Sequence, residues 1–219
     1  MNNSKYGKVL TIILIIIIIG IVGVLGYIGY NALKEKNMKK AYTEAAEEFE
    51  KSITGNGATK GSGSNSTLNA VNVTKNNRKT LEGYEIIGTI EIPKIELKCP
   101  ILDGVNKRIL EIAVGKIYSV DDLNKPGNTV IYGHNYRNTL FFSRNDELSN
   151  GDTIYILDQE GNKMEYKIFN IFETTASDTS FYTRTADMTE GKAEVTLSTC
   201  TDDASTTEGR LIIQARENN

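Results

Sequence analysis

The residue types best suited to covalent chemistry are scarce in this chain. Its 219 residues include two cysteines, Cys99 and Cys200, and a single histidine, His134. Cys200 ends the run 194–200, which alternates as a strand does and places its thiol on the polar side. A structural cysteine more often lies among apolar neighbours, where the thiol stays protonated and inert. This local pattern leaves a functional and a structural Cys200 evenly matched.

A cation follows Cys200 in the sequence at a distance that suits a strand–loop–strand unit. Residues 201–209 separate Cys200 from Arg210, which opens the next apolar run. If the two strands are antiparallel neighbours, the loop places Arg210 beside the thiol. A guanidinium is permanently charged and can stabilise a thiolate or the oxyanion of an acyl-transfer intermediate. The alternative is a surface arginine paired with Asp202 or Asp203, which by itself is the commoner arrangement.

His134 ends another expected strand, 129–134, and Gly133 leaves room next to it. A lone histidine is more often structural than catalytic. Cysteine chemistry, however, needs a group that pairs with the thiolate and later protonates a leaving amine, and imidazole does both near neutral pH. The three side chains are therefore candidates for the nucleophile, the general acid/base and the oxyanion-binding group.

The elements that would position these residues are short strands. Apolar, β-branched runs recur after about residue 80, and turn sequences separate them. The runs cover residues 86–92, 129–132, 153–157, 165–172, 194–199 and 210–215. Many short strands predict a sandwich or a barrel, and residues 158–163 predict a hairpin turn. Short helices are expected only around 108–113 and 139–148.

The N-terminal part has a different composition. Residues 9–29 are apolar and uncharged, and as a helix they would be about 31 Å long, enough to cross a bilayer. A cleaved signal peptide is the alternative, but the apolar stretch is longer than usual and no clear cleavage site follows it. We therefore assign residues 1–31 to a membrane anchor. Counting the flanking lysines by the positive-inside rule favours the cytoplasmic side for the rest of the chain.

Residues 32–79 connect this anchor to the strand-rich region 80–219, which is the expected catalytic domain. Residues 32–53 are rich in Ala, Glu and Lys with apolar positions at helical spacing, so they predict a juxtamembrane helix, which we interpret as a solvated spacer. Residues 54–77 are dominated by Gly, Ser, Asn and Thr and are expected to form a flexible tether.

Composition argues against several other functions. The net charge is −3 and no basic stripe is interleaved with aromatic residues, so a nucleic-acid partner is not expected. Two cysteines and one histidine are too few for a zinc site or a disulfide-rich scaffold. We therefore expect no metal and no cofactor.

Several short motifs occur in the order and spacing of a known family. They are Ile87-Gly88-Thr89-Ile90-Glu91-Ile92-Pro93, Gly133-His134-Asn135, Thr196-Leu197-Ser198-Thr199-Cys200 and Gly209-Arg210-Leu211. Together they resemble the sortases, the cysteine transpeptidases that attach proteins to the cell wall of Gram-positive bacteria. The resemblance covers about residues 81–216. It implies a mainly β fold, a closed β-barrel with short helices, preceded by a transmembrane helix and placed outside the cell.

The resemblance also implies a mechanism. Cys200 would attack the carbonyl of a C-terminal sorting signal similar to Leu-Pro-x-Thr-Gly and form a thioester. His134 would protonate the departing amine and deprotonate the incoming amine, typically that of a peptidoglycan precursor, while Arg210 would hold the substrate oxygen. Attack by water would give hydrolysis instead. The residues expected to line the substrate site are Ser198, Thr199 and Asn135. Some sortases use calcium, which by resemblance makes Asp121 and Asp122 candidate ligands, but paired surface acids at a turn are usually solvated.

The subclass is open between class D and a class B-like variant. Ser198 and Asn135 look like class B, but residues 183–192 are too few for the long helix that class B enzymes carry before the cysteine strand. The pilin-polymerising class fits less well, since we find neither an Asp-Pro-aromatic lid motif nor a hydrophobic C-terminal tail.

Two alternatives to a sortase are compatible with parts of the sequence. One is a membrane-tethered, non-catalytic β-domain that binds a wall or protein ligand and contains a Cys99–Cys200 disulfide. Cys99 precedes Pro100 within an apolar strand, so we interpret it instead as a buried free thiol. The other alternative, a papain-like hydrolase, fits less well because the histidine precedes the cysteine and no Gln-containing cysteine motif opens a helix.

Overall fold

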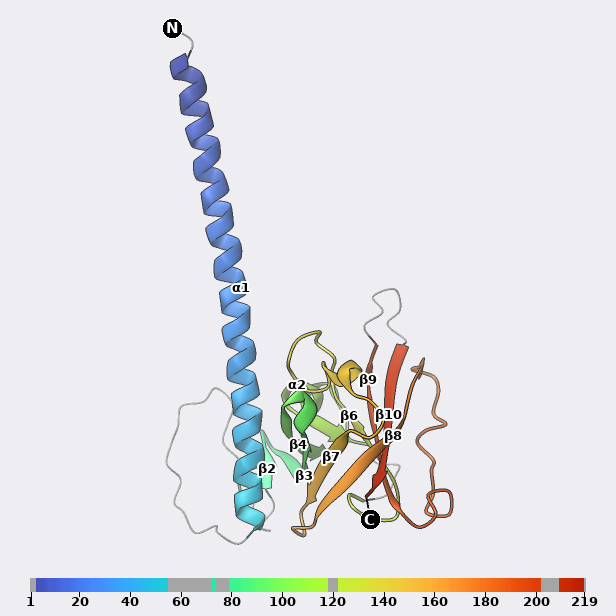
Figure 1. Cartoon of the computed structure of the whole chain (residues 1–219). Helices are drawn as coiled ribbons and strands as arrows, with labels where there is room; N and C mark the ends of the chain where they lie inside the picture. Colours follow the sequence, from blue (N-terminus) through green and yellow to red (C-terminus); the bar gives the residue numbers. More distant parts are fainter. Residues whose placement is uncertain (1–2, 55–71, 74–78, 118–121, 202–208, 219) are drawn as a thin grey trace. The chain divides into compact units, whose positions relative to one another are not determined.

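The computed structural model of this chain describes residues 3–54, 72–73, 79–117, 122–201 and 209–218. The chain divides into two compact units, residues 1–38 and 39–219. Helix α1 (Asn3–Ile53) begins in the first unit and ends in the second (Figure 1). The tether expected over residues 54–77 falls almost entirely outside the described residues.

Within the first unit, the stretch of α1 from Val9 to Leu33 is apolar on nearly all sides. Between Val9 and Leu33 it carries no charged side chain, and its large apolar side chains are exposed. A helix that is apolar all round needs protein or lipid around it. Among the described residues, α1 is the one helix long and apolar enough to cross a membrane, which makes it a candidate membrane span.

Among the described residues of the second unit, eight strands form a closed β-barrel (Figure 1). They are β3 (Tyr84–Ile92), β4 (Leu97–Asp103), β5 (Val114–Lys116), β6 (Gly127–Tyr132), β7 (Thr153–Asp158), β8 (Lys163–Thr175), β9 (Ala193–Cys200) and β10 (Gly209–Glu217). Their order is β3-β4-β5-β6-β9-β10-β8-β7, and pairing of β7 with β3 closes the barrel. Closure leaves these strands without a free edge, so the prediction of a barrel is confirmed and the sandwich is excluded.

Smaller elements complete the second unit. Strands β1 (Asn72–Val73) and β2 (Lys79–Leu81) extend the sheet beside β3, and 3₁₀ turn η1 (Pro93–Ile95) precedes β4. Helix α2 (Lys107–Ile112) confirms the helix expected near 108–113. Around 139–148, where at most a short helix was expected, the structure has only the short 3₁₀ turn η2 (Asn145–Glu147). Phe141 has a φ of 49°, a left-handed conformation that a right-handed helix cannot accommodate.

The predicted hairpin between β7 and β8 is confirmed. The two strands pair antiparallel, and Gly161 adopts a φ of 87° in the turn that joins them. The Asp158 carboxylate accepts hydrogen bonds from the backbone amides of Glu160 and Asn162, both at 2.9 Å. Aspartate and glycine therefore act here as turn-forming residues.

Strand β9 is buried along its whole length apart from its last residue, Cys200. It lies between β6, with which it pairs in parallel, and β10, with which it pairs antiparallel. The polar side of this strand, which Thr196 and Ser198 share with Cys200, is not a solvent-facing side before Cys200, because Thr196 and Ser198 are fully buried. The Thr196 hydroxyl instead donates a hydrogen bond to Asn128 Oδ1 at 2.8 Å.

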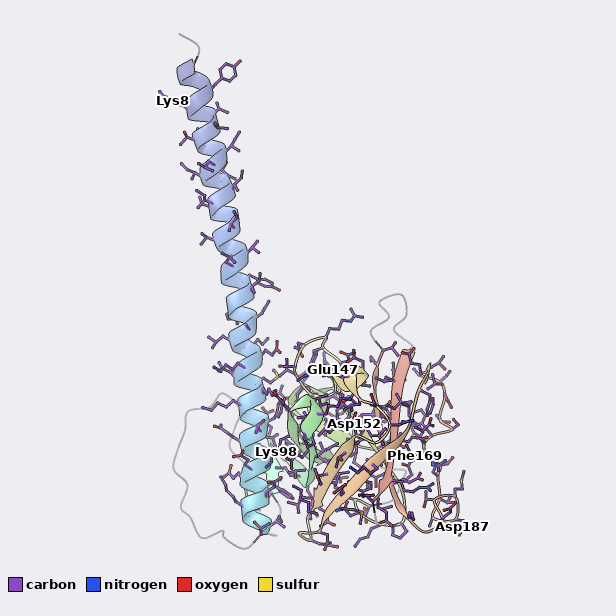
Figure 2. The ribbon with its side chains drawn as sticks, viewed as in Figure 1. Lys8, Lys98, Glu147, Asp152, Phe169 and Asp187 are labelled. Carbon is purple, nitrogen blue, oxygen red and sulfur yellow. The ribbon has the colours of Figure 1, made fainter. Side chains whose placement is uncertain are left out.

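The last part of α1, residues 39–53, packs against the barrel within the second unit. Its buried face consists of Ala41, Tyr42, Ala45, Ala46 and Phe49. At the end of the helix, Glu50 accepts hydrogen bonds from Lys98 Nζ at 2.7 Å and from Thr89 Oγ1 at 3.0 Å (Lys98 is labelled in Figure 2).

The interpretation of this helix as a solvated spacer is therefore wrong for residues 39–53. The helix itself was predicted correctly, but its Ala, Glu and Lys content indicates only that a helix is stable. The small alanines allow the helix backbone to approach the barrel, and the two aromatic rings fill the space beside them. This part of α1 is an integral piece of the barrel domain.

Candidate active site

Three neighbouring strand ends bring the predicted catalytic residues together. Strands β6 and β9 run parallel, with Tyr132 opposite Ser198, so the chain that leaves β6 places His134 next to the end of β9. Strands β9 and β10 run antiparallel, with Cys200 directly opposite Arg210. The antiparallel neighbour expected for the cysteine strand is thus confirmed. All three residues lie at the same end of the barrel, because parallel strands end at one edge and an antiparallel strand begins there.

The Cys200 thiol is exposed and free, and it is accompanied by a cation. Arg210 Nη1 lies 3.6 Å from Cys200 Sγ and donates a hydrogen bond to the Gly209 carbonyl at 2.9 Å. The contact with the backbone holds the guanidinium beside the sulfur. A fixed positive charge at this distance can stabilise an oxygen that becomes negative next to the sulfur. Asp202 and Asp203, the alternative partners considered for Arg210, lie outside the described residues.

His134 is half-buried at the end of β6. Burial lowers the pKa of its imidazole below the ordinary value near 6.5, and the negative charge of Glu111 opposes this effect in part. Its ring lies against that of Tyr136, with 4.8 Å between centroids. The neutral imidazole is therefore the favoured form near neutral pH, and it can accept a proton.

Gly133 is required for the path of the chain into His134. A Cβ atom at this position would lie 2.6 Å from Cδ2 of the buried Phe142 ring, too close for any other residue without movement of the ring. Thr199 fixes the peptide group between Gly133 and His134, since the Thr199 hydroxyl donates a hydrogen bond to the Gly133 carbonyl at 2.8 Å. The neighbouring strand thus holds the backbone directly before the histidine.

Comparison with known proteins identifies the family of this barrel. The family model "Sortase domain" matches residues 90–218. The chain belongs to the sortase family. This match contains all three candidate catalytic residues.

Individual sortases show the extent of the similarity. Sortase A of Bacillus anthracis is 30% identical over 122 residues, 55% of each chain. Sortase D of Bacillus subtilis (strain 168) is 34% identical over 113 residues, 52% of this chain and 53% of that protein. The chain therefore spans about half the length of these curated relatives.

Solved structures agree with the family assignment. The Clostridium perfringens Sortase D5 transpeptidase is 30% identical with a TM-score of 0.54, covering 61% of this chain and 79% of that one. Sortase A from Corynebacterium diphtheriae is 26% identical with a TM-score of 0.56, and the match covers 83% of this chain and 84% of that one. Similar proteins thus carry the names of more than one sortase class.

The sortase residues expected to line a substrate groove occupy different places. Ser198 is fully buried, and the buried Thr199 hydroxyl is bound to the Gly133 carbonyl, so neither side chain faces solvent beside the thiol. The groove-lining role is therefore not supported for these two residues in this structure. Asn135 is half-buried, and its side-chain amide donates to the Cys200 carbonyl at 3.1 Å. Asn135 thus links the chain after His134 to the end of the cysteine strand.

Two tyrosines of the sortase site were missed by sequence reasoning. The hydroxyl groups of Tyr132 and Tyr182 are hydrogen-bonded to each other. Burial and Tyr182 raise the pKa of Tyr132, and the charge of Arg210 opposes this effect in part. Tyr132 ends β6, two residues before His134, and the sequence predicted a strand over 129–134, so alternation within that run is a signal that could have indicated Tyr132. No motif marks Tyr182.

The second cysteine of the sortase barrel is inert. Cys99 is fully buried on β4 and its sulfur lies 3.5 Å from the Pro100 carbonyl oxygen. Burial raises its pKa far above the ordinary range of a thiol. Both cysteines are free, so the Cys99–Cys200 disulfide of the alternative hypothesis is absent.

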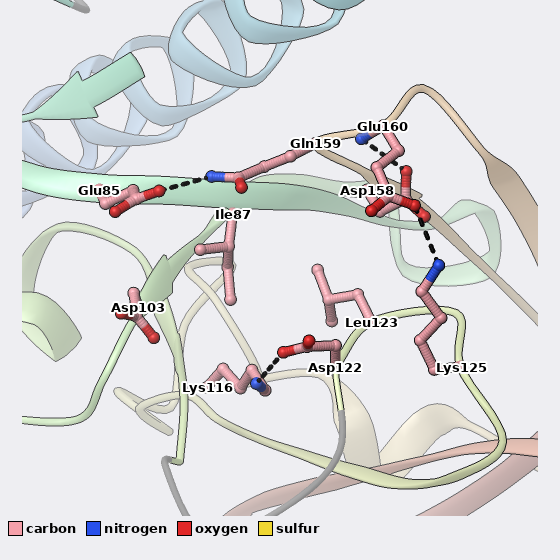
Figure 3. Close-up of a pocket in the computed structure, with 10 residues that line it drawn as sticks. All are labelled: Glu85, Ile87, Asp103, Lys116, Asp122, Leu123, Lys125, Asp158, Gln159 and Glu160. Atoms are coloured by element: carbon pink, nitrogen blue, oxygen red, sulfur yellow. Dashed lines mark hydrogen bonds and ion pairs between the residues drawn. The ribbon is translucent and has the colours of Figure 1, made fainter. Parts of the chain in front are cut away.

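A separate pocket of about 300 Å³ lies beside the start of β6, whereas His134 follows the end of that strand (Figure 3). Its polar side chains are largely engaged with one another. Lys116 pairs with Asp122 at 3.1 Å, and Lys125 pairs with Glu160 at 2.9 Å. The described residues contain no group of three or more side chains that could hold a metal ion, and Asp121 lies outside them.

Proposed function

We propose that this sortase is a transpeptidase that cleaves a C-terminal sorting signal and transfers the new carboxyl end to an amine. The observation that carries this proposal is the exposed Cys200 thiol, 3.6 Å from the Arg210 guanidinium and opposite the strand end that presents His134. This arrangement combines a nucleophile, a positive charge and a proton carrier at one edge of the barrel.

In the first half-reaction, Cys200 Sγ bonds to the carbonyl carbon of the scissile peptide. The neutral imidazole of His134 accepts the thiol proton, and the carbonyl oxygen becomes an oxyanion next to Arg210. When the tetrahedral intermediate collapses, the C–N bond breaks and the imidazolium gives its proton to the departing amine. The product is a thioester that joins Cys200 to the N-terminal part of the substrate.

In the second half-reaction, an incoming amine attacks the thioester carbonyl. His134 takes a proton from that amine, the C–S bond breaks, and the thiol of Cys200 is regenerated with the same proton. The proposed acceptor is an amine of a peptidoglycan precursor, and the proposed donors are surface proteins that end in an LPxTG-like signal. If water replaces the amine, the outcome is hydrolysis.

The proposed location is the outer face of a bacterial membrane. The apolar part of α1 serves as a single-pass anchor, and the barrel domain lies outside the cell, where sorting signals and wall precursors meet. Family membership supports this orientation, whereas the lysine count around the apolar stretch favours the opposite one. Labelling of Cys200 in intact cells with a membrane-impermeant thiol reagent tests the orientation, and protection until the cells are lysed would contradict it.

The proposed chemistry is tested with the full chain in detergent and a small library of sorting-signal peptides. The wild type is expected to cleave one class of peptide and to show an added mass, on Cys200, equal to the N-terminal part of that peptide. Cys200→Ala is expected to lose both signals, whereas Cys99→Ala retains both because Cys99 is buried on another strand. Cleavage by Cys200→Ala would overturn the assignment.

A further inference from the structure

A row of aromatic rings connects α1 to the candidate general acid/base. The ring of Tyr42, on the helix, lies 5.2 Å from that of Phe141, centroid to centroid. Phe141 lies 6.1 Å from Tyr136, and Tyr136 lies 4.8 Å from His134. All three pairs are tilted, an arrangement in which aromatic rings attract one another. The barrel-bound part of α1 is therefore in indirect contact with the imidazole.

The segment that carries these rings is a small closed loop. Asn135 and Phe141 form an isolated antiparallel bridge, and the Phe142 amide donates to the His134 carbonyl at 3.2 Å. The Tyr136 amide donates to Ser143 Oγ at 2.8 Å. Because both ends of the loop are joined, a shift of Phe141 is transmitted to His134.

Phe141 depends on an outside support for its position. It is 1% exposed, yet its φ of 49° lies in the left-handed region that a bulky side chain adopts only when the surrounding structure imposes it. Tyr42, which is fully buried, is one of the groups that pack against its ring. The helix thus helps to hold the loop in a conformation that the loop alone disfavours.

The helix is in turn fixed to the barrel away from this loop. Glu50 pairs with Lys98 at 2.7 Å, and Thr43 Oγ1 donates to the Lys98 carbonyl at 3.4 Å. These contacts join the helix to β4. Tyr42 is therefore presented by an element whose own position is set by the barrel wall.

We propose that Tyr42, on the barrel-bound part of α1, acts through Phe141 and Tyr136 to hold His134 in place. This inference rests on the proposed catalytic role of His134. It makes Tyr42 a positioning residue, since its ring contacts Phe141 and reaches the imidazole only through the loop.

The test compares two aromatic residues on the same buried helix face. Tyr42→Ala removes a ring from the row, whereas Phe49→Ala removes a ring that is equally buried but outside it. We expect Tyr42→Ala to lower kcat for peptide cleavage by about tenfold to a hundredfold, the size of effect that a small misplacement of a catalytic group produces. Phe49→Ala is expected to stay within about twofold of the wild type. Tyr42→Phe, which keeps the ring, should do the same.

A second measurement separates positioning from general loss of structure. The chain has one histidine, so its NMR titration midpoint reports His134 without ambiguity. Tyr42→Ala should loosen the loop, expose the imidazole and move the midpoint upward toward the ordinary value, while Phe49→Ala leaves it unchanged. If Tyr42→Ala is too unstable to measure, Tyr42→Leu keeps most of the apolar volume and removes the ring.

The outcomes distinguish this inference from the function on which it rests. If His134→Ala loses activity but Tyr42→Ala and Tyr42→Leu keep both the wild-type kcat and the wild-type midpoint, the positioning inference is overturned and the proposed function stands. Equal losses in Tyr42→Ala and Phe49→Ala, at equal midpoints, would overturn it as well. Full activity in His134→Ala would instead overturn the proposed function.

Discussion

At the scale of single residues, Arg210 is held by the Gly209 carbonyl with its Nη1 atom next to the Cys200 sulfur. A lysine offers a single ammonium in place of a planar fork, so Arg210→Lys keeps a positive charge but loses the fixed geometry. We expect this variant to lower kcat/KM for a sorting-signal peptide by about tenfold or more, and Arg210→Ala by about a hundredfold to a thousandfold. Arg108→Lys, in an exposed ion pair with Glu82, is the matched control.

The two cysteines should differ sharply in reactivity. Cys200 is exposed beside a cation, whereas Cys99 is fully buried and its pKa is raised by that burial. One equivalent of a thiol reagent is therefore expected to react with the native protein, at Cys200, and a second only after denaturation. Peptide mapping by mass spectrometry identifies the modified residue. Rapid native labelling in Cys200→Ser would contradict the burial of Cys99.

The imidazole of His134 predicts a pH dependence of stability. Burial lowers its pKa in the folded state below the value near 6.5 of the unfolded chain. Above about pH 7 the imidazole is mostly neutral in both the folded and the unfolded state, so its titration does not change the free energy of unfolding there. As the pH falls through 6.5, the unfolded state binds the proton more readily, and the free energy of unfolding decreases. Urea denaturation between pH 5 and 7.5 should show this decrease, and His134→Gln should reduce it.

At the scale of elements, the parallel pairing of β6 with β9 brings His134, which follows β6, next to Cys200 at the end of β9. The Thr199 side chain holds the backbone before His134 at this end of the barrel. Thr199→Val removes the hydroxyl that binds the Gly133 carbonyl and leaves that carbonyl without this donor. We expect a loss of about 1 to 3 kcal/mol in the free energy of unfolding together with a lower kcat. Thr199→Ser keeps the hydroxyl and should retain most of both. Equal unfolding free energies and equal kcat values for Thr199→Val and Thr199→Ser would show that this hydrogen bond is unimportant.

The elements differ in how far the sequence predicts them. Alternation and turn residues predicted six of the eight barrel strands. Strand β4 was indicated only by the apolar surroundings of Cys99, and the three-residue strand β5 was missed. The order of motifs predicted that His134, Cys200 and Arg210 belong to one site. The pattern could not show that Ser198 and Thr199 are buried, because burial on both sides of β9 depends on its neighbours in the closed barrel. Tyr182 was missed for the same reason, since its contact with Tyr132 joins segments 50 residues apart.

At the scale of the whole molecule, the domain that includes the barrel starts earlier than the strand pattern suggests. Tyr42 and Phe49 are buried within the second unit, and burial of one such side chain contributes about 1.5 to 3 kcal/mol. A soluble fragment of residues 39–219 is therefore expected to exceed fragment 54–219 in unfolding free energy by about 3 kcal/mol or more. Fragment 81–219, which begins near the boundary expected from sequence, should be no more stable than 54–219. Equal stability of the first two fragments would contradict the packing of the helix.

The parallel ladder between β6 and β9 also has a consequence for how the molecule acquires activity. The hydrogen bond between Thr199 and Gly133 joins residues 66 positions apart, whereas Cys200 and Arg210 are only ten apart. Long-range contacts must overcome loop-closure entropy before they return stabilisation, so they form slowly. During folding, the thiol and its guanidinium can therefore meet before the imidazole arrives. A chain at that stage holds a nucleophile without its proton carrier, and acyl transfer begins only when the barrel has closed.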